Sequence, residues 1–443
     1  MRNLTRTIPY RPLTALLAAL FLVACSEAPT PTATPTLKTG PWQARVELPG
    51  GAATFGMEVA RDANGLVVTL INGTERIRVP QVTLSDDRIS IQFPAFNNRI
   101  DARLQADGRL SGTLTLVKRY GKTQVIPFAA APGSQQSAQA PIAAAGDLSG
   151  RWEVTFTEED GSTYPAVGEF SQRGNRLLGT FLTETGDYRF LGGSVNGQQM
   201  KLSTFDGAHA FLFSANMLDD GRLQGQFWSG NASLESWTAR RNDNAKLADM
   251  STLTFLKPGY ERFEFTFPDL DGNPVSLDDE RFAGKVVLVT LAGSWCPNCH
   301  DEAAFMADFY KRYRDQGVEV VALMYEHLED EAAAREQVRL FREKFGIEYT
   351  TLLAGISDKT MAGETLPMLN QVLAYPTTLF IDRRGEVREI HTGFSGPGTG
   401  EYYEALKKKI TTLVDTLVAE PAVDIEPAEE VAAAGATASA AAG

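Results

Sequence analysis

Hydrophobic and polar residues alternate with a period of two over two long stretches in the first half of the chain. Segments such as 76–79 and 152–156 place every second side chain on one face, which is the pattern of a half-buried strand. Asn-Gly and Asp-Gly dipeptides separate such segments, and these dipeptides tolerate the positive φ angles of tight hairpin turns. They occur at residues 64–65, 72–73, 107–108, 196–197, 206–207 and 220–221. The pattern predicts antiparallel sheets.

The two stretches resemble copies of one unit. Gly40-Pro41-Trp42 is echoed by Gly150-Arg151-Trp152, and residues 107–112 are echoed by residues 220–225. We therefore predict two duplicated all-β units, 41–129 and 149–240, each a small barrel or sandwich, with a linker over 130–148. Neither copy contains a recognisable catalytic cluster, and the lone His209 is expected to be structural.

The pattern changes after a second linker over 241–261. Residues 286–291 and 318–323 form nearly continuous apolar runs, as in the buried strands of an α/β sheet, and an amphipathic helix separates them. Further elements are expected in the following order: a helix over 329–345, a strand over 375–382, its hairpin partner over 388–391 and a final helix over 403–417. These elements predict an α/β domain over 262–418, and the composition after it predicts a disordered acidic and Ala-rich tail over 419–443.

Composition narrows the class of protein. The chain is 43% hydrophobic and 22% charged, close to the average of soluble globular proteins. Its net charge of −13 argues against a nucleic-acid partner, which would require a basic surface. Among 443 residues there are three cysteines, Cys25, Cys296 and Cys299, so a scaffold stapled by disulfides is excluded.

The N-terminus predicts a lipoprotein signal peptide over residues 1–24. Three arginines precede an apolar run of signal-peptide length, which is too short to predict a membrane-spanning helix. The run ends in Leu22-Val23-Ala24-Cys25, which resembles the bacterial lipobox. We expect Cys25 to carry a lipid anchor on the periplasmic side of the cell envelope, followed by an extended tether over 25–40. Ser26 favours the outer membrane by similarity to Gram-negative sorting signals, and an ordinary signal peptide is the alternative.

Candidate chemistry lies in the sequence Cys296-Pro297-Asn298-Cys299, shortly after the first apolar run of the α/β region. At the start of a helix, Cys296 would meet unpaired N–H groups and a partial positive charge, which favour the thiolate. Residues i and i+3 lie on one face there, within disulfide reach. Cys299 could therefore resolve a mixed disulfide formed by Cys296. This chemistry requires no cofactor and no metal ion.

The order of elements and several separated motifs resemble the TlpA-like thiol-disulfide oxidoreductases, extracytoplasmic relatives of thioredoxin that are often held at a membrane. The resemblance covers about 262–418. It rests on a hairpin-like segment over 265–277, on Phe282-Ala283-Gly284-Lys285, on Trp295 beside Cys296, and on Tyr375-Pro376-Thr377-Thr378, where the family keeps a cis-proline.

The resemblance implies roles for individual residues. It implies that Glu302 tunes the two thiols, as a glutamate at this place does in the cytochrome-maturation branch; the alternative is a surface acid stabilised by the helix dipole. Thr290 stands where thioredoxin has a buried aspartate. Substrate would be bound by Trp295, Pro297, Tyr375, Pro376 and Thr377, with the cis-proline presenting an edge to a substrate peptide.

The implied function is thiol-disulfide exchange with client proteins that carry disulfides, with reduction favoured over oxidation. Electrons would come from a membrane dithiol donor. Two alternatives remain open. Cys296 to His300 also satisfies CxxCH, the attachment pattern of c-type haem, although we expect His300 to be a helix-surface residue near the active site. The β units could instead make the chain a ligand-binding envelope lipoprotein with an accessory thioredoxin-like domain.

Overall fold

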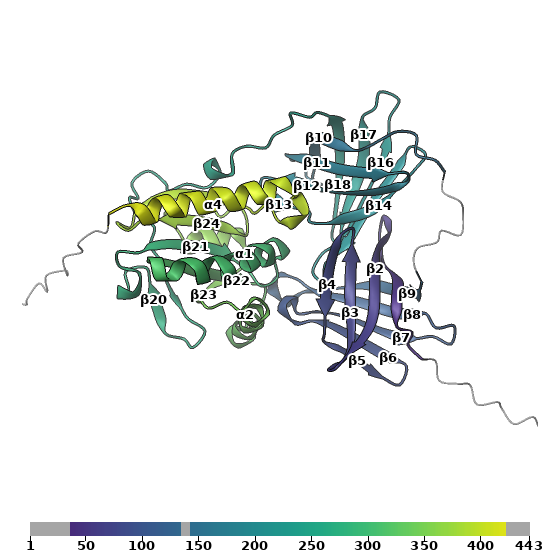
Figure 1. Cartoon of the computed structure of the whole chain (residues 1–443), viewed down its shortest axis with the longest axis horizontal. Coiled ribbons are helices and arrows are strands. Elements are labelled where there is room, and N and C mark those ends of the chain that lie inside the picture. Colours follow the sequence, from purple (N-terminus) through teal and green to yellow (C-terminus); the bar gives the residue numbers. More distant parts are fainter. Residues whose placement is uncertain (1–35, 134–141, 422–443) are drawn as a thin grey trace, which may run out of the picture. The chain divides into compact units, whose positions relative to one another are not determined.

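The computed structural model describes residues 36–133 and 142–421. The predicted signal peptide, Cys25, most of the tether and nearly all of the tail lie outside the described residues. Two all-β units are followed by an α/β domain in the described part of the chain (Figure 1). The predicted fold class is therefore confirmed.

The first β unit is a nine-stranded antiparallel sheet with the spatial order β4-β3-β2-β1-β9-β8-β7-β6-β5. Burial alternates along its strands, as the period-two pattern predicts. The strands are β1 (Gly40–Leu48), β2 (Gly51–Asp62), β3 (Gly65–Asn72), β4 (Glu75–Val79), β5 (Val82–Ser85), β6 (Arg88–Phe93), β7 (Asn98–Leu104), β8 (Leu110–Val117) and β9 (Thr123–Pro132), with the short 3-10 turns η1 (Pro94–Phe96) and η2 (Arg119–Gly121).

The second β unit has the spatial order β11-β10-β18-β17-β16-β15-β14-β12-β13, and an additional pairing of β11 with β12 closes this sheet on itself. It is therefore a barrel. Aromatic rings fill its core; the rings of Phe213 and Phe227, for example, stack with their centroids 4.2 Å apart. Its strands are β10 (Gly150–Thr157), β11 (Thr163–Arg173), β12 (Arg176–Thr183), β13 (Gly186–Asp187), β14 (Leu191–Asn196), β15 (Gln199–Phe205), β16 (Ala210–Met217), β17 (Leu223–Ser229) and β18 (Ser233–Arg241).

Equivalent residues of the two units adopt the same local geometry. The indole N–H of Trp42 donates a hydrogen bond to the carbonyl of Lys38 at 3.0 Å, and that of Trp152 donates to Leu148 at 2.9 Å. Each of these tryptophans lies on the first strand of its unit, and that strand pairs with the last strand of the unit. The sequence echo thus reflects a duplicated structure.

The turn between β15 and β16 of the second unit completes the core of the first unit. Phe205 at its start is fully buried, and its ring lies 5.2 Å from that of Phe55 and 5.4 Å from that of Phe93. The side chain of Asn72 clamps the backbone of Phe205, donating to its carbonyl at 3.0 Å and accepting from its N–H at 3.2 Å. The β15–β16 segment of the second unit is therefore part of the core of the first unit, while the barrel keeps a separate aromatic core.

The α/β domain contains a five-stranded sheet of order β23-β22-β21-β24-β25. Strands β21, β22 and β23 are parallel, whereas β24 is antiparallel to β21. Every residue of β21 is buried, as its continuous apolar run predicts. A small hairpin of β19 and β20 precedes the sheet, where the sequence motif indicates one.

Strand β23 and helix α3 lie in the segment 346–374, for which the sequence pattern predicts no element. The elements of the domain are β19 (Thr266–Pro268), β20 (Pro274–Ser276), β21 (Val286–Ala292), α1 (Pro297–Tyr313), β22 (Val318–Glu326), α2 (Glu331–Phe345), β23 (Thr350–Ile356), α3 (Lys359–Thr365), β24 (Thr377–Ile381), β25 (Val387–Thr392) and α4 (Glu401–Ala419), with the 3-10 turns η3 (Met250–Thr252), η4 (Glu280–Phe282), η5 (Arg314–Gln316) and η6 (Pro397–Thr399).

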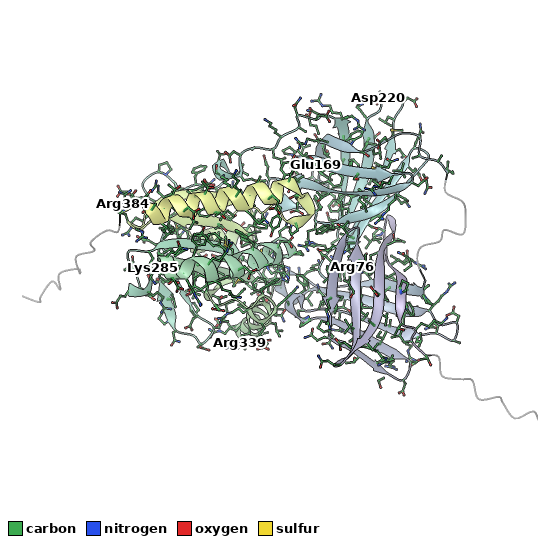
Figure 2. All side chains as sticks on the ribbon, viewed as in Figure 1. Arg76, Glu169, Asp220, Lys285, Arg339 and Arg384 are labelled. Atoms are coloured by element: carbon green, nitrogen blue, oxygen red, sulfur yellow. A yellow bond between two sulfur atoms is a disulfide. The ribbon has the colours of Figure 1, made fainter. Side chains whose placement is uncertain are left out.

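Charged side chains lie mainly at the surface of the described residues; Arg76, Asp220 and Arg384 are labelled examples in Figure 2. Within the described ranges, no helix is long and apolar enough to cross a membrane.

Candidate active site

The two cysteines lie at the start of α1, directly after the loop that follows β21. Cys296 is the N-cap residue of the helix, and its Sγ accepts the N–H of Cys299 at 3.1 Å. The two residues form a disulfide, with their Cα atoms 5.2 Å apart. Cys296 is 5% exposed and Cys299 only 1%, so Cys296 is the more accessible of the two residues. The helix N-terminus offers its unpaired N–H groups to a thiolate at Cys296.

Predicted substrate-binding residues surround Cys296. The peptide bond between Tyr375 and Pro376 is cis, and the carbonyl oxygen of Tyr375 lies 3.3 Å from the Cys296 Sγ. Trp295 donates its indole N–H to the carbonyl of Tyr325 at 2.8 Å, and its ring makes an edge contact with that of Tyr375, with centroids 5.7 Å apart. These residues fix the backbone next to the reactive sulfur.

The other two predicted substrate residues lie deeper. Thr377 begins β24, is buried, and donates its hydroxyl to the carbonyl of Ala374 at 2.9 Å. Pro297 is the first residue of α1 and is also buried, and its carbonyl accepts a hydrogen bond from Arg189 of the second β unit.

Glu302 lies one turn after Cys299 on α1 and is 3% exposed. The hydroxyl of Thr290 on β21 donates to its Oε2 at 2.6 Å, and that of Thr378 on β24 donates to its Oε1 at 2.7 Å. Burial raises the pKa of Glu302 to about 7, although both hydrogen bonds oppose this shift. The alternative of a surface acid is therefore wrong, because the helix turns Glu302 toward the sheet.

A second buried carboxyl supports the loop before the cysteines. Glu326, at the end of β22, accepts the backbone N–H of Ser294 at 2.9 Å and its hydroxyl at 2.6 Å. Burial raises the pKa of Glu326 to about 7 as well. This carboxyl holds the segment that leads into Trp295 and Cys296.

His300 is buried, which contradicts the expectation of a helix-surface residue. Its ring stacks on Phe96 of the first β unit, with centroids 4.1 Å apart, and contacts Phe341 and Phe345 of α2. Its Nε2 lies 2.6 Å from the carbonyl oxygen of Ser294, and its Nδ1 lies 3.0 Å from the Lys344 ammonium. Burial, reinforced by the charge of Lys344, holds the pKa of His300 well below its usual range. The expectation is wrong because Phe96, which belongs to the first β unit, covers this face of α1.

These contacts do not fit a c-type haem. Attachment would consume both sulfurs, which here bond to each other. An iron ligand would require a free ring nitrogen of His300, and both nitrogens have partners beneath Phe96.

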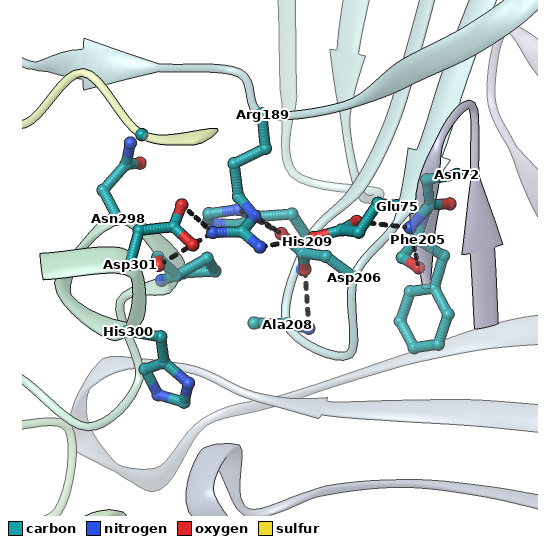
Figure 3. A network of polar contacts seen from close by, with 12 residues as sticks. Asn72, Glu75, Arg189, Phe205, Asp206, Ala208, His209, Asn298, His300 and Asp301 are labelled. Carbon is teal, nitrogen blue, oxygen red and sulfur yellow. Dashed lines mark hydrogen bonds and ion pairs between the residues drawn. The ribbon is translucent and has the colours of Figure 1, made fainter. Parts of the chain in front are cut away.

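Sequence reasoning missed two residues of the second β unit, Asp187 and Arg189, which contact the start of α1. Figure 3 shows Arg189 beside this end of the helix. No motif marks them. Arg189 has a positive φ of 57°, which is uncommon for a residue with a side chain, but a sequence does not reveal such an angle.

The arrangement is suited to two successive exchange steps. A thiolate at Cys296 can attack a disulfide, and Cys299, within bonding distance of Cys296, can resolve the product. Glu302, with its pKa near neutrality, can accept and return a proton in the interior.

Comparison with known protein sequences points to the same chemistry. Residues 258–406 match the Redoxin family. The thiol-disulfide oxidoreductase ResA of Bacillus thuringiensis subsp. konkukian (strain 97-27) is 33% identical over 157 residues, which are 35% of this chain and 80% of that protein. ResA of Bacillus anthracis is 31% identical over 156 residues, again 35% and 80% of the two chains. A crystal structure of a putative thiol:disulfide interchange protein DsbE from Chlorobium tepidum is 26% identical and covers 36% of this chain and 99% of its own, with a TM-score of 0.28.

Proposed function

Because the chain belongs to the TlpA-like thiol-disulfide oxidoreductases of the thioredoxin superfamily, we propose that its Cys296–Cys299 pair reduces disulfides of client proteins in the cell envelope. Thiol-disulfide exchange is the activity of the family. The reductive direction, the clients and the location are the proposal.

The environment of Cys299 and Glu302 carries the proposed direction. A buried thiol next to an apolar core and a carboxyl loses stabilisation of its thiolate. A pair whose reduced form is strongly stabilised becomes an oxidant, as in DsbA. Here the resolving thiol lies in an apolar core one helical turn from a carboxyl, so its reduced form gains little from ionisation. The weak stabilisation of a Cys299 thiolate supports the proposed reductive direction, whereas the helix N-terminus acts the other way by stabilising the Cys296 thiolate.

The proposed reaction balances in two steps. The Cys296 thiolate attacks one sulfur of the client disulfide, a mixed disulfide forms, and the other client sulfur leaves as a thiolate that takes up a proton. Glu302 accepts the proton of Cys299, whose thiolate then attacks the Cys296 Sγ and breaks the mixed disulfide. The second client sulfur leaves as a thiolate and takes up a proton, while Glu302 releases the proton that it accepted from Cys299. The client gains two electrons and two protons in total, and the pair ends as a disulfide. A membrane dithiol donor returns two electrons and two protons to the pair.

Substitution of each cysteine tests this scheme. With a disulfide-bonded test protein and a small dithiol as electron donor, Cys296→Ala should lower turnover to the uncatalysed rate. Cys299→Ala should accumulate a mixed disulfide, detected by intact mass and released by reductant, because the resolving thiol is missing. Turnover that is unaffected by both substitutions would contradict the assignment.

The location rests on the N-terminal sequence. We propose that Cys25 is acylated after removal of residues 1–24 and anchors the chain on the periplasmic side, with the outer membrane favoured by Ser26. Several acyl chains on one cysteine would hold firmly, since each buried methylene contributes about 0.8 kcal/mol. Cys25→Ala should therefore move the protein from the membrane fraction to the soluble fraction. A wild-type protein without the mass of a lipid would disprove the anchor.

A further inference from the structure

Both residues that separate the two cysteines are contacted by the second β unit. The carbonyl of Pro297 accepts a hydrogen bond from Nη1 of Arg189 at 3.1 Å. The side-chain amide of Asn298 donates to Oδ2 of Asp187 at 3.2 Å. Figure 3 shows Arg189 between the start of α1, with Asn298 and Asp301, and the carboxylates of the β units.

The segment of the second β unit that carries Asp187 and Arg189 fits closely against the α/β domain. Oδ2 of Asp187 also accepts the N–H of Gly396 at 2.7 Å. A Cβ atom on Gly396 would lie 3.2 Å from this carboxylate oxygen and 2.6 Å from Asp301, and one on Gly393 would lie 3.0 Å from the backbone of Gly186. The contact therefore depends on glycine at both positions of the segment 393–396.

Arg189 joins the three folded regions through ion pairs. Its guanidinium binds Glu75 of the first β unit, Asp206 of the second at 3.5 Å, and Asp301 of α1. The side chain of Arg189 is 11% exposed, and those of its three partners are 8%, 2% and 12% exposed. Because these charges are buried, water screens them weakly, and they act on neighbouring groups more strongly than surface charges would.

We propose that Asp187 and Arg189 are positioning residues of the redox site, through which the second β unit sets the redox equilibrium of the Cys296–Cys299 pair. Neither residue needs to touch a client. They hold Pro297 and Asn298, and they place charges of opposite sign at the N-terminus of α1, where the thiolate forms.

The two charges act in opposite directions. The guanidinium of Arg189 favours the Cys296 thiolate and hence the dithiol form, whereas the ionised carboxylate of Asp187 disfavours both. Burial raises the pKa of Asp187, so the effect of its charge grows as the pH rises. Neither variant replaces the other titratable groups near this end of α1 and around Arg189, which are Asp301, Glu302, His300, Glu326, Lys344, Tyr375, Glu75 and Asp206. Burial raises the pKa of Asp301 and the charge of Arg189 opposes this shift, so R189Q also favours the protonated form of Asp301, and the alkylation profile of Cys296 reports the net effect. The proposal requires the exchange chemistry of the pair but not its direction.

The test measures the equilibrium of the pair with glutathione, using the mature chain with Cys25→Ala. Two glutathione thiols give two electrons and two protons to the disulfide and become glutathione disulfide. R189Q should shift the equilibrium toward the protein disulfide by about threefold or more, equivalent to half a pKa unit at Cys296, and D187N should shift it the other way. The pH profile of Cys296 alkylation should move up in R189Q and down in D187N.

Two controls separate tuning from general destabilisation. R151Q removes another arginine of the second β unit that contacts the α/β domain, through Glu401 and the ring of Tyr402, and should leave the equilibrium unchanged. R189K keeps the charge and should stay closer to wild type than R189Q. Thermal unfolding identifies any variant that does not fold.

The proposal would be overturned if R189Q and D187N shift the equilibrium with glutathione no more than R151Q does. It would also be overturned if R189Q and D187N shift this equilibrium in the same direction. If R189Q does not fold, D187N decides alone, and an unchanged equilibrium there overturns it. A wild-type couple that proves oxidising would contradict the proposed function but leave this test intact.

Discussion

Glu302 connects the chemistry of the site to the stability of the chain. Its carboxyl is buried between two threonine hydroxyls, and the pKa of Glu302 rises to about 7. Thr290, which stands where thioredoxin has an aspartate, donates one of these hydrogen bonds. Position 290 is therefore polar in both proteins but has a different role here, since Thr290 orients the carboxyl of Glu302 and is not itself the acid.

The raised pKa of Glu302 predicts a stability that falls with pH. Below about pH 4.5 the carboxyl is protonated in both states; between there and about pH 7 the unfolded chain loses the proton while the folded chain keeps it. The contribution is thus complete at low pH and is lost as pH rises through 7, by up to about 3 kcal/mol. Glu302→Gln should remove this loss, measured by urea unfolding at pH 5 and pH 8.

Glu264→Gln, at an exposed position of the same domain, is the control and should follow wild type. Glu326 contributes a similar pH dependence in every variant, because burial raises its pKa too. Equal pH dependence in wild type and Glu302→Gln would contradict the burial of an ionisable Glu302.

Residues that react could be predicted from the sequence, because the spacing of Cys296 and Cys299 and the motif around Pro376 are local. Residues that act through tertiary contacts could not. His300 was expected at the surface because nothing in α1 shows that Phe96, far away in the sequence, covers it. Arg189 belongs to no motif, and its partners come from three different regions of the chain.

At the scale of elements, strong turn signals in the sequence predicted the hairpins well, whereas short elements such as helix α3 were not predicted. The six Asn-Gly and Asp-Gly pairs named in the sequence analysis lie at junctions between consecutive strands, with at least one residue of each pair outside the strands. Helix α3 has seven residues, includes Gly363 and two threonines, and so has little intrinsic helix propensity. Its stability comes from the Asp358 cap, whose side chain accepts the N–H groups of Thr360 and Met361. Such a helix carries no periodic pattern.

We expect one side chain beside the turn that links β15 and β16 to contribute strongly to the free energy of unfolding. Phe205→Ala should lower the free energy of unfolding by about 3–5 kcal/mol, because it leaves a cavity where the second β unit completes the core of the first. Urea unfolding measures this loss. Phe255→Ala, at a side chain that is 50% exposed, should change stability by less than about 0.5 kcal/mol. Equal losses in the two variants would contradict the contribution of Phe205 to the core of the first β unit.

At the scale of the whole molecule, the β units contact the active-site helix and the segment that follows β22. Phe96 covers His300, Arg189 holds Pro297, and the N–H of Gly121 donates to the carbonyl of His327 at 3.2 Å, next to Trp295. The contacts join the redox centre to the β units. No local sequence pattern encodes them, because they depend on how separately formed cores meet.

This docking predicts an altered titration of His300. Phe96→Ala should expose the ring, and its pKa should rise from well below the usual range toward about 6.5, since burial is the largest cause of the shift. NMR titration of the imidazole protons measures this change. Phe128→Ala, which removes another buried ring of the first β unit, should leave the titration of His300 in place. An unchanged titration in Phe96→Ala would contradict the cover over His300.

The proposed reduction of client disulfides is tested most directly by the reduction potential of the Cys296–Cys299 pair in the mature chain, measured by redox titration with alkylation and intact mass. We expect a reversible two-electron couple near that of thioredoxin, about −270 mV, as a reductant of client disulfides requires. A potential near that of DsbA, about −120 mV, would make the pair an oxidant and contradict the proposed function.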